Sequence, residues 1–110
     1  MNWKNIRIAE IQGIEKVVAE FYVRCVKYIP NCQFRVKITQ DIDGKYSGHV
    51  NLAVRNSRNV SPKWVGGSGD SIDEALENSI KELVKSIKSS GKNVNLLQEE
   101  DFEWSAPEDF

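Results

Sequence analysis

The sequence predicts a small α+β domain in which helices pack on one face of an antiparallel sheet. Two alternating apolar runs flank an Asp-Gly pair, which is the pattern of a β-hairpin. A later segment opens with a capping box and then carries apolar residues at helical spacing. The chain has 110 residues, of which 40% are hydrophobic and 28% are charged, so its length and composition fit one folded domain.

The hairpin is predicted over residues 34–54. Phe34, Val36 and Ile38 alternate with polar residues, and Asp43-Gly44 then favours a tight turn because such turns need positive φ. The return strand alternates through Tyr46, Gly48, Val50, Leu52 and Val54. We expect a short third strand at 63–65, which the glycines at 66, 67 and 69 convert into a flexible turn.

Two helices are predicted, one before and one after these strands. Ser71 and Glu74 form the capping box of the second helix, which runs to Lys88 and ends at Gly91. The first helix is predicted over residues 6–28. Its apolar stripe consists of Ile11, Ile14, Val18, Phe21 and Cys25. The expected order is therefore α-β-β-β-α, with a three-stranded antiparallel sheet and both helices on one face.

Charge divides the chain into a basic domain, residues 1–97, and an acidic aromatic tail, residues 98–110. The net charge is −1, yet six of the 16 acidic residues lie in the tail, which contains no Lys or Arg. The tail also carries Phe102, Trp104 and Phe110. Large aromatic side chains are costly to leave in water, so the tail packs on the domain or on a partner, unless it is a disordered acidic terminus.

The composition excludes several classes of protein. Cys25 and Cys32 are too few for a disulfide framework and lack the companions of a zinc site. No apolar run approaches the ~18 residues of a membrane span, and the first residues lack the apolar core of a signal peptide. We therefore expect a cytoplasmic protein with reduced thiols and no membrane contact.

No motif in the chain indicates catalysis. His49 is the only histidine, and no Ser or Cys nucleophile accompanies it in a local motif. Gly66-Gly67-Ser68-Gly69 precedes a helix but lacks the lysine of a phosphate-binding loop. The protein is therefore predicted not to be an enzyme, with no catalytic residues, no cofactor and no metal.

Residues 34–88 resemble the HicB antitoxin family. Asp43-Gly44-Lys45-Tyr46 matches the acidic-Gly hairpin of that family, and residues 69–78, with the sequence GDSIDEALEN, match the opening of its helix. The Pro-Gly-Cys segment usual before that helix is absent, and an acidic tail stands where many members add a DNA-binding domain. The resemblance implies a fold that binds and silences a partner protein, often one that acts on RNA.

The predicted order of elements also resembles the double-stranded RNA-binding domain. That family places two lysines in the first turn of its last helix, where they contact phosphates. Asp73 and Glu74 occupy the corresponding positions here, and their carboxylates would repel a phosphate by roughly a kcal/mol or more per pair. The resemblance therefore implies a shared fold without that contact to RNA.

Together these observations predict a non-enzymatic protein that inhibits or regulates a nucleic-acid-handling partner protein by steric occlusion. The partner would be a toxin ribonuclease, as for antitoxins, or a defence nuclease, as for phage anti-CRISPR proteins. The alternative is a nucleic-acid-binding module that uses the basic sheet face, and a homodimer through sheet edges or the first helix is left open. The expected partner-binding residues are Glu99, Glu100, Asp101, Phe102, Glu103 and Trp104, with Arg35, Lys37 and His49 as the alternative surface.

Overall fold

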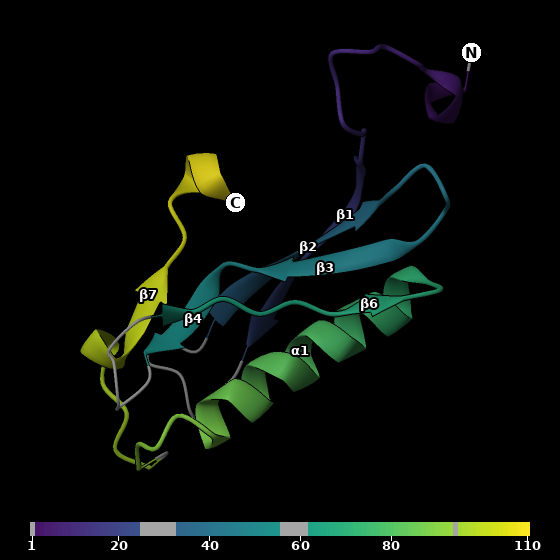
Figure 1. The fold of residues 1–110 in the computed structure, drawn as a ribbon. Helices are drawn as coiled ribbons and strands as arrows, with labels where there is room; N and C mark the ends of the chain where they lie inside the picture. The colour runs from purple at the N-terminus through teal and green to yellow at the C-terminus, as the bar shows by residue number, and fades with distance from the viewer. Residues whose placement is uncertain (1, 25–32, 56–61, 94) are drawn as a thin grey trace.

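A computed structural model describes residues 2–24, 33–55, 62–93 and 95–110, and it confirms the α+β class (Figure 1). The larger sheet has the strand order β1-β2-β3-β6, and the smaller sheet has the order β5-β4-β7. The strands are β1 (Lys16–Arg24), β2 (Gln33–Gln40), β3 (Tyr46–Val50), β4 (Leu52–Arg55), β5 (Pro62–Lys63), β6 (Ser68–Gly69) and β7 (Phe102–Trp104). The helix α1 (Ile72–Lys88) is accompanied by the 3-10 turns η1 (Trp3–Asn5), η2 (Glu99–Asp101) and η3 (Pro107–Asp109).

The predicted hairpin is confirmed as the antiparallel pair β2–β3. Val36 lies opposite Val50 and Thr39 lies opposite Ser47, so the apolar residues of both strands share one face. Gly44 in the connecting turn has φ of +87°, a conformation that favours glycine. The hairpin is therefore fixed by local sequence, as the alternation and the Asp-Gly pair predicted.

The predicted first helix is wrong, because residues 16–24 form strand β1 and residues 6–15 are irregular apart from short turns. Cys25 and the rest of the predicted helix lie outside the described residues. β1 pairs antiparallel with β2, and its side chains alternate between the two faces of the sheet. Ala19, Phe21 and Val23 face the core, whereas Glu20, Tyr22 and Arg24 face away from it. The segment is rich in Val, Phe and Tyr, which prefer strands, so this alternation outweighs the helical spacing.

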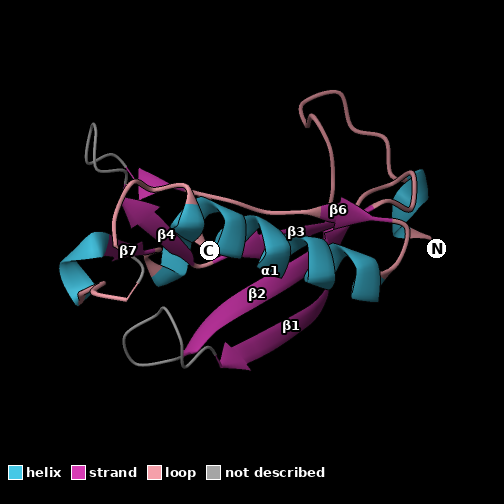
Figure 2. Ribbon diagram, turned by 90° about the horizontal axis from the view of Figure 1, so that it is seen from below, coloured by secondary structure: helices cyan, strands magenta, loops and turns pink. Residues whose placement is uncertain are grey.

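The helix α1 covers one face of the larger sheet, over β2, β3 and β6 (Figure 2). Its start shows the Ser71 half of the predicted capping box, in which the Ser71 hydroxyl accepts a hydrogen bond from the Glu74 N–H at 3.1 Å. The core between helix and sheets includes Ala75, Leu83 and Ile87 from α1, together with Phe34, Val36, Ile38, Leu52 and Val54 from the strands. No helix within the described residues is both long and apolar enough to cross a membrane.

The glycines that were expected to form a flexible turn instead lie in an extended segment, residues 62–69, beside β3 and β4. The Gly48 N–H donates to the Gly67 carbonyl at 2.6 Å. A Cβ atom on Gly67 would lie 2.6 Å from the backbone of Asn78 and of Ser79, so only glycine lets α1 approach this closely. The glycine run therefore serves helix packing, and the prediction of a flexible turn is wrong.

Asn51 joins the two sheets at a bend between β3 and β4. Its side-chain carbonyl accepts the Arg35 N–H at 2.8 Å, and its own N–H donates to the Arg35 carbonyl at 3.1 Å. Its backbone carbonyl accepts the Ser105 N–H at 2.8 Å. One residue thus connects β2 of the larger sheet to the end of β7 in the smaller one.

The tail packs on the rest of the chain rather than extending into solvent. β7 pairs antiparallel with β4, with Phe102 opposite Val54 and Trp104 opposite Leu52. Phe102 is only 6% exposed and belongs to the main hydrophobic core. β4 lies between β5 and β7, and three consecutive β4 residues, 52–54, are all buried. Because successive side chains of a strand point to opposite faces, β4 is covered on both faces.

Candidate binding surface

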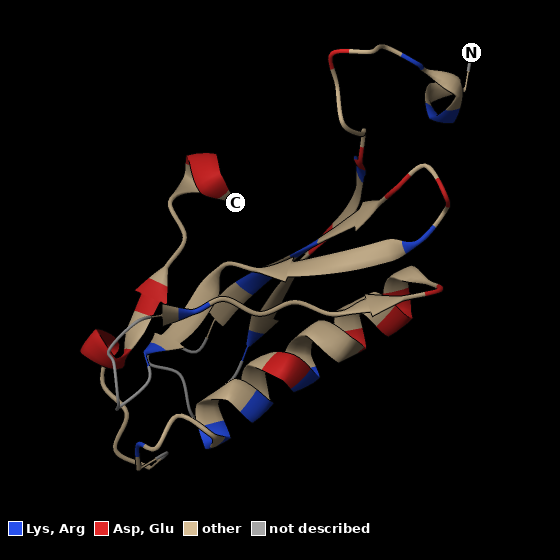
Figure 3. Ribbon diagram, viewed as in Figure 1, with Lys and Arg blue, Asp and Glu red and all other residues tan. Residues whose placement is uncertain are grey.

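Acidic residues recur along the tail, on η2, on β7 and on η3 (Figure 3). Two of them are paired at 2.8 Å with bases of the domain, Asp101 with Lys92 and Glu103 with Arg55. The others lie on the 3-10 turns on either side of β7. The exposed acids of the tail are Glu99, Glu100, Glu108 and Asp109. The pairs hold the tail in place, and the exposed acids give its outer side a negative charge.

Asp101 is held in its charged form by its neighbours. A side-chain hydrogen bond from Lys92 is the largest cause that lowers the pKa of Asp101, and the Gln98 N–H, 2.8 Å away, lowers it further. The positive charge of Lys92 acts in the same direction, and partial burial opposes it. Asp101 is thus an anchor of the tail as well as one of the predicted partner-binding residues.

The predicted basic surface on the open face of the sheet is occupied by other side chains of the same molecule. The Arg35 guanidinium lies 5.6 Å from the centre of the Tyr22 ring and 5.4 Å from that of Phe110, and it pairs with Glu20. The Lys37 ammonium lies 4.8 Å from the centre of the Phe110 ring. Phe110 therefore brings the tail onto the two bases, so the two surfaces predicted as alternatives adjoin one another.

His49 lies exposed on the open face, one strand away from Lys37, which is its direct cross-strand partner. Its Nε2 atom lies 3.3 Å from the Thr39 hydroxyl, which lies 3.2 Å from the Glu15 carboxylate. A carboxylate only accepts hydrogen bonds, so the single proton of Thr39 goes to Glu15 and His49 donates from Nε2. This chain orients the imidazole at the margin of the tail.

A hollow of about 500 Å³ lies between the tail and the segment that follows β5. We call it the tryptophan hollow, and its lining includes His49, Trp64, Glu103, Trp104, Asp109 and Phe110. Trp64 is 46% exposed and Trp104 is 41% exposed, unusually high values for the largest apolar side chains. The sequence indicated Trp104 but not Trp64, because a single Trp in a segment predicted as a short strand carries no local signal of binding.

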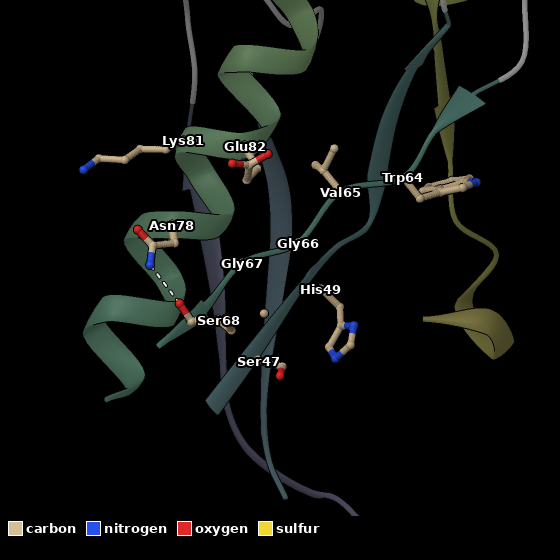
Figure 4. A pocket seen from close by; sticks show the side chains of 11 residues that line it. Ser47, His49, Trp64, Val65, Gly66, Gly67, Ser68, Asn78, Lys81 and Glu82 are labelled. Carbon is tan, nitrogen blue, oxygen red and sulfur yellow. Dashed lines mark hydrogen bonds between the residues drawn. The ribbon is translucent and has the colours of Figure 1, made fainter. Parts of the chain in front are cut away.

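An open groove of about 760 Å³ continues from this hollow along α1 (Figure 4). His49 and Trp64 line both depressions, and the helix contributes Asn78, Lys81 and Glu82 to the groove. The Asn78 amide donates to the Ser68 carbonyl at 2.8 Å and so fixes the helix against the groove floor. The groove is polar on its helix side and aromatic at the Trp64 end.

The chemistry of the tryptophan hollow suits a positively charged group. Exposed aromatic side chains attract cations, and the neighbouring carboxylate of Asp109 adds to that attraction. Within the described ranges, no three His, Cys, Asp or Glu side chains gather as a metal site would require. No known protein family, curated protein or solved structure matches this chain.

Proposed function

We propose that this protein is a non-enzymatic binding protein that blocks a nucleic-acid-handling partner, such as a toxin ribonuclease or a defence nuclease, by steric occlusion. The observation that carries the proposal is the packed acidic tail. Its exposed acids lie on the turns before and after β7, which Phe102 anchors, and one of them, Asp109, lines the tryptophan hollow with the half-exposed Trp64 and Trp104. A partner would meet this surface already in place, without first having to order the tail.

The mechanism follows from the chemistry of proteins that handle nucleic acids. Their channels are lined with Lys and Arg, which contact phosphates. Exposed carboxylates at Glu99, Glu100 and Asp109 offer negative charge to such a channel, and Trp64 and Trp104 offer flat rings to its Arg and Lys side chains. Occupation of the channel by the tail would exclude the nucleic acid.

The packing of the basic residues favours this proposal over the nucleic-acid-binding alternative. Arg35 is engaged by Tyr22, Phe110 and Glu20, and Lys37 by Phe110. A phosphate would have to displace an aromatic ring and compete with a carboxylate at these two positions. Glu100, Glu108 and Asp109, by contrast, are exposed at the outer side of the tail.

The test is capture of proteins from extracts of the source cells on the immobilised full chain. We expect a nucleic-acid-handling protein to be retained, and its activity on nucleic acid to fall when the full chain is added. Glu99→Lys combined with Glu100→Lys should weaken that inhibition about tenfold or more. The matched control, Glu10→Lys with Glu77→Lys, reverses two exposed acids away from the tail and should leave inhibition unchanged.

Two results would contradict the proposal. One is a captured protein that binds both charge-reversed variants equally well, which would remove the tail from the interface. The other is steep, salt-dependent binding of the full chain to duplex RNA that is lost in Lys37→Ala, which would favour the nucleic-acid-binding module.

A further inference from the structure

The outer edge of β1 is open. β1 is nine residues long and stands at the end of the larger sheet, paired with β2 alone. No backbone hydrogen bond joins its outer side to any other described residue. Proteins commonly shorten, bend or cover such edges, because unpaired N–H and C=O groups recruit another strand. β1 has a single irregularity near Lys16, between Val17 and Ala19, and its remaining length is regular.

Apolar surface accompanies this edge on both faces of the sheet. On the open face, Val17 is 56% exposed and Tyr22 is 65% exposed. On the helix face, Phe21 and Val23 are only partly buried, because α1 lies mainly over β3 and β6 (Figure 2). An occupant of the edge would therefore bury side chains as well as backbone groups.

One flank of α1 extends this apolar surface. Asn78 and Glu82 face the groove on the β6 side, so the opposite flank of the helix points toward the β1 side. That flank carries Ile80 and Val84, which line an apolar groove of about 510 Å³. Lysines border this groove, so the surface is apolar at its centre and positively charged at its rim.

The sequence of β1 is complementary to itself in one register. When two copies are aligned antiparallel about Tyr22, Glu20 of each copy lies opposite Arg24 of the other. Phe21 then lies opposite Val23 on the helix face, and the two Tyr22 rings meet on the open face. Opposite charges and aromatic–aliphatic pairs at directly opposed positions stabilise antiparallel strands.

The main competing register is disfavoured by charge. An alignment about Glu20 would place the two Glu20 carboxylates against each other and Lys16 opposite Arg24. Like charges directly opposite one another destabilise a strand pair.

We propose that two copies of this chain pair through β1, antiparallel and centred on Tyr22, to form a twofold dimer with one continuous eight-stranded sheet. The dimer does not depend on the proposed function, because it rests on the open edge of β1 and not on the exposed acids of the tail.

Charge exchange tests the register. Arg24→Glu opposes Glu20 with a second carboxylate, and Glu20→Arg opposes Arg24 with a second base. Each variant alone should dissociate at least tenfold more readily than the unmodified chain in sedimentation equilibrium. An equimolar mixture of the two should recover dimers that contain one copy of each. Lys16→Glu, at the end of β1 that the pairing omits, is the matched control and should leave the dimer intact.

Disulfide trapping gives a second readout of the same register. In a Cys25→Ser, Cys32→Ser background, Tyr22→Cys places two thiols directly opposite each other, about 5 Å apart between Cβ atoms. Glu20→Cys places them four residues out of step, on the order of 13 Å apart. Mild oxidation should therefore link copies of Tyr22→Cys and leave copies of Glu20→Cys unlinked. Two results would overturn the proposal. One is a chain that stays monomeric at concentrations of about 100 µM, roughly the range in which weak dimers form. The other is a disulfide that links copies of Glu20→Cys but not copies of Tyr22→Cys.

Discussion

β1 and β7 are both outer strands, yet their environments are opposite. β7 has three residues, one of which, Phe102, is inserted into the core, while Asp101 and Glu103 pair with bases of the domain. β1 has nine residues, and the most apolar of them remain partly or largely exposed. The shorter strand is therefore the one that is held by side chains, and the longer strand is held mainly by its backbone pairing with β2.

The difference shows what decides whether an edge strand is complete within one molecule. A buried aromatic residue helps to fix the position of a short strand, because its burial adds to the β4 pairing and the two ion pairs in offsetting the entropy lost by the tail. A long strand whose aromatic residue is only partly buried, as Phe21 is, keeps apolar surface for another molecule. The two strands thus have separate roles, β7 in closing the fold and β1 in offering an edge.

The largest effect should come from deleting the aromatic ring of each strand in turn. Phe102→Ala should lower the free energy of unfolding by about 3 kcal/mol, because Phe102 lies in the core. Phe21→Ala should cost about 1.5 kcal/mol in dilute solution, since its ring is only partly buried. Urea unfolding at low micromolar concentration measures both. Equal losses for the two variants would mean that β1 is held as firmly as β7.

A smaller effect should separate the ion pairs of the two strands. The Lys92–Asp101 side chains are 22% and 19% exposed, and the Arg35–Glu20 side chains are 38% and 36% exposed. A double-mutant cycle with Lys92→Met and Asp101→Asn should give a coupling energy of about 1 kcal/mol. The corresponding cycle with Arg35→Met and Glu20→Gln should give about 0.3 kcal/mol, because solvent screens that pair more strongly. A larger coupling in the β1 pair would reverse the assignment of which strand is anchored.

The smallest expected effect is on the stability of the protein at acidic pH, to which Asp101 contributes. Because the pKa of Asp101 is lower in the folded protein than its ordinary value near 3.9, its stabilising contribution is complete above about pH 4. That contribution is lost as the pH falls through the lowered folded pKa. Urea unfolding between pH 6 and pH 2.5 should show a shallower loss of stability in Asp101→Asn than in the unmodified chain. Glu20→Gln on β1 is the control, and an identical pH profile for Asp101→Asn would remove Asp101 as an anchor.

Local sequence was sufficient for the hairpin and for α1. The alternation around Gly44 and the cap at Ser71 are short-range signals, and both elements form where these residues predict. Local sequence was insufficient for β1, because its apolar residues fit two patterns. Val18 and Phe21 have the spacing of a helix face, with a period of 3.6 residues, whereas Phe21 and Val23 have the spacing of a strand face, with a period of two. A strand can satisfy its backbone only beside a neighbour, so the pairing with β2 decided between the two periods.

The candidate surface was predictable only in its composition. Acids and aromatic residues in the tail indicated a binding segment, but its position depends on the pairing of Phe102 with Val54, 48 residues earlier in the chain. Trp64 and Phe110 acquire their neighbours in the same way, through contacts that no spacing in the sequence encodes. The structure thus adds the two features that matter most for the proposal, a tail that is held in place and a hollow between two tryptophans.

Asn51 links the tail to strand β2, which carries Arg35 and Lys37. Its side-chain amide takes the place of a backbone carbonyl for Arg35, while its backbone holds Ser105 just beyond β7. Displacement of the tail would break the hydrogen bond from Ser105 to Asn51. The other two hydrogen bonds of Asn51 hold the backbone of Arg35, so substitution of this one asparagine would alter the support of both segments.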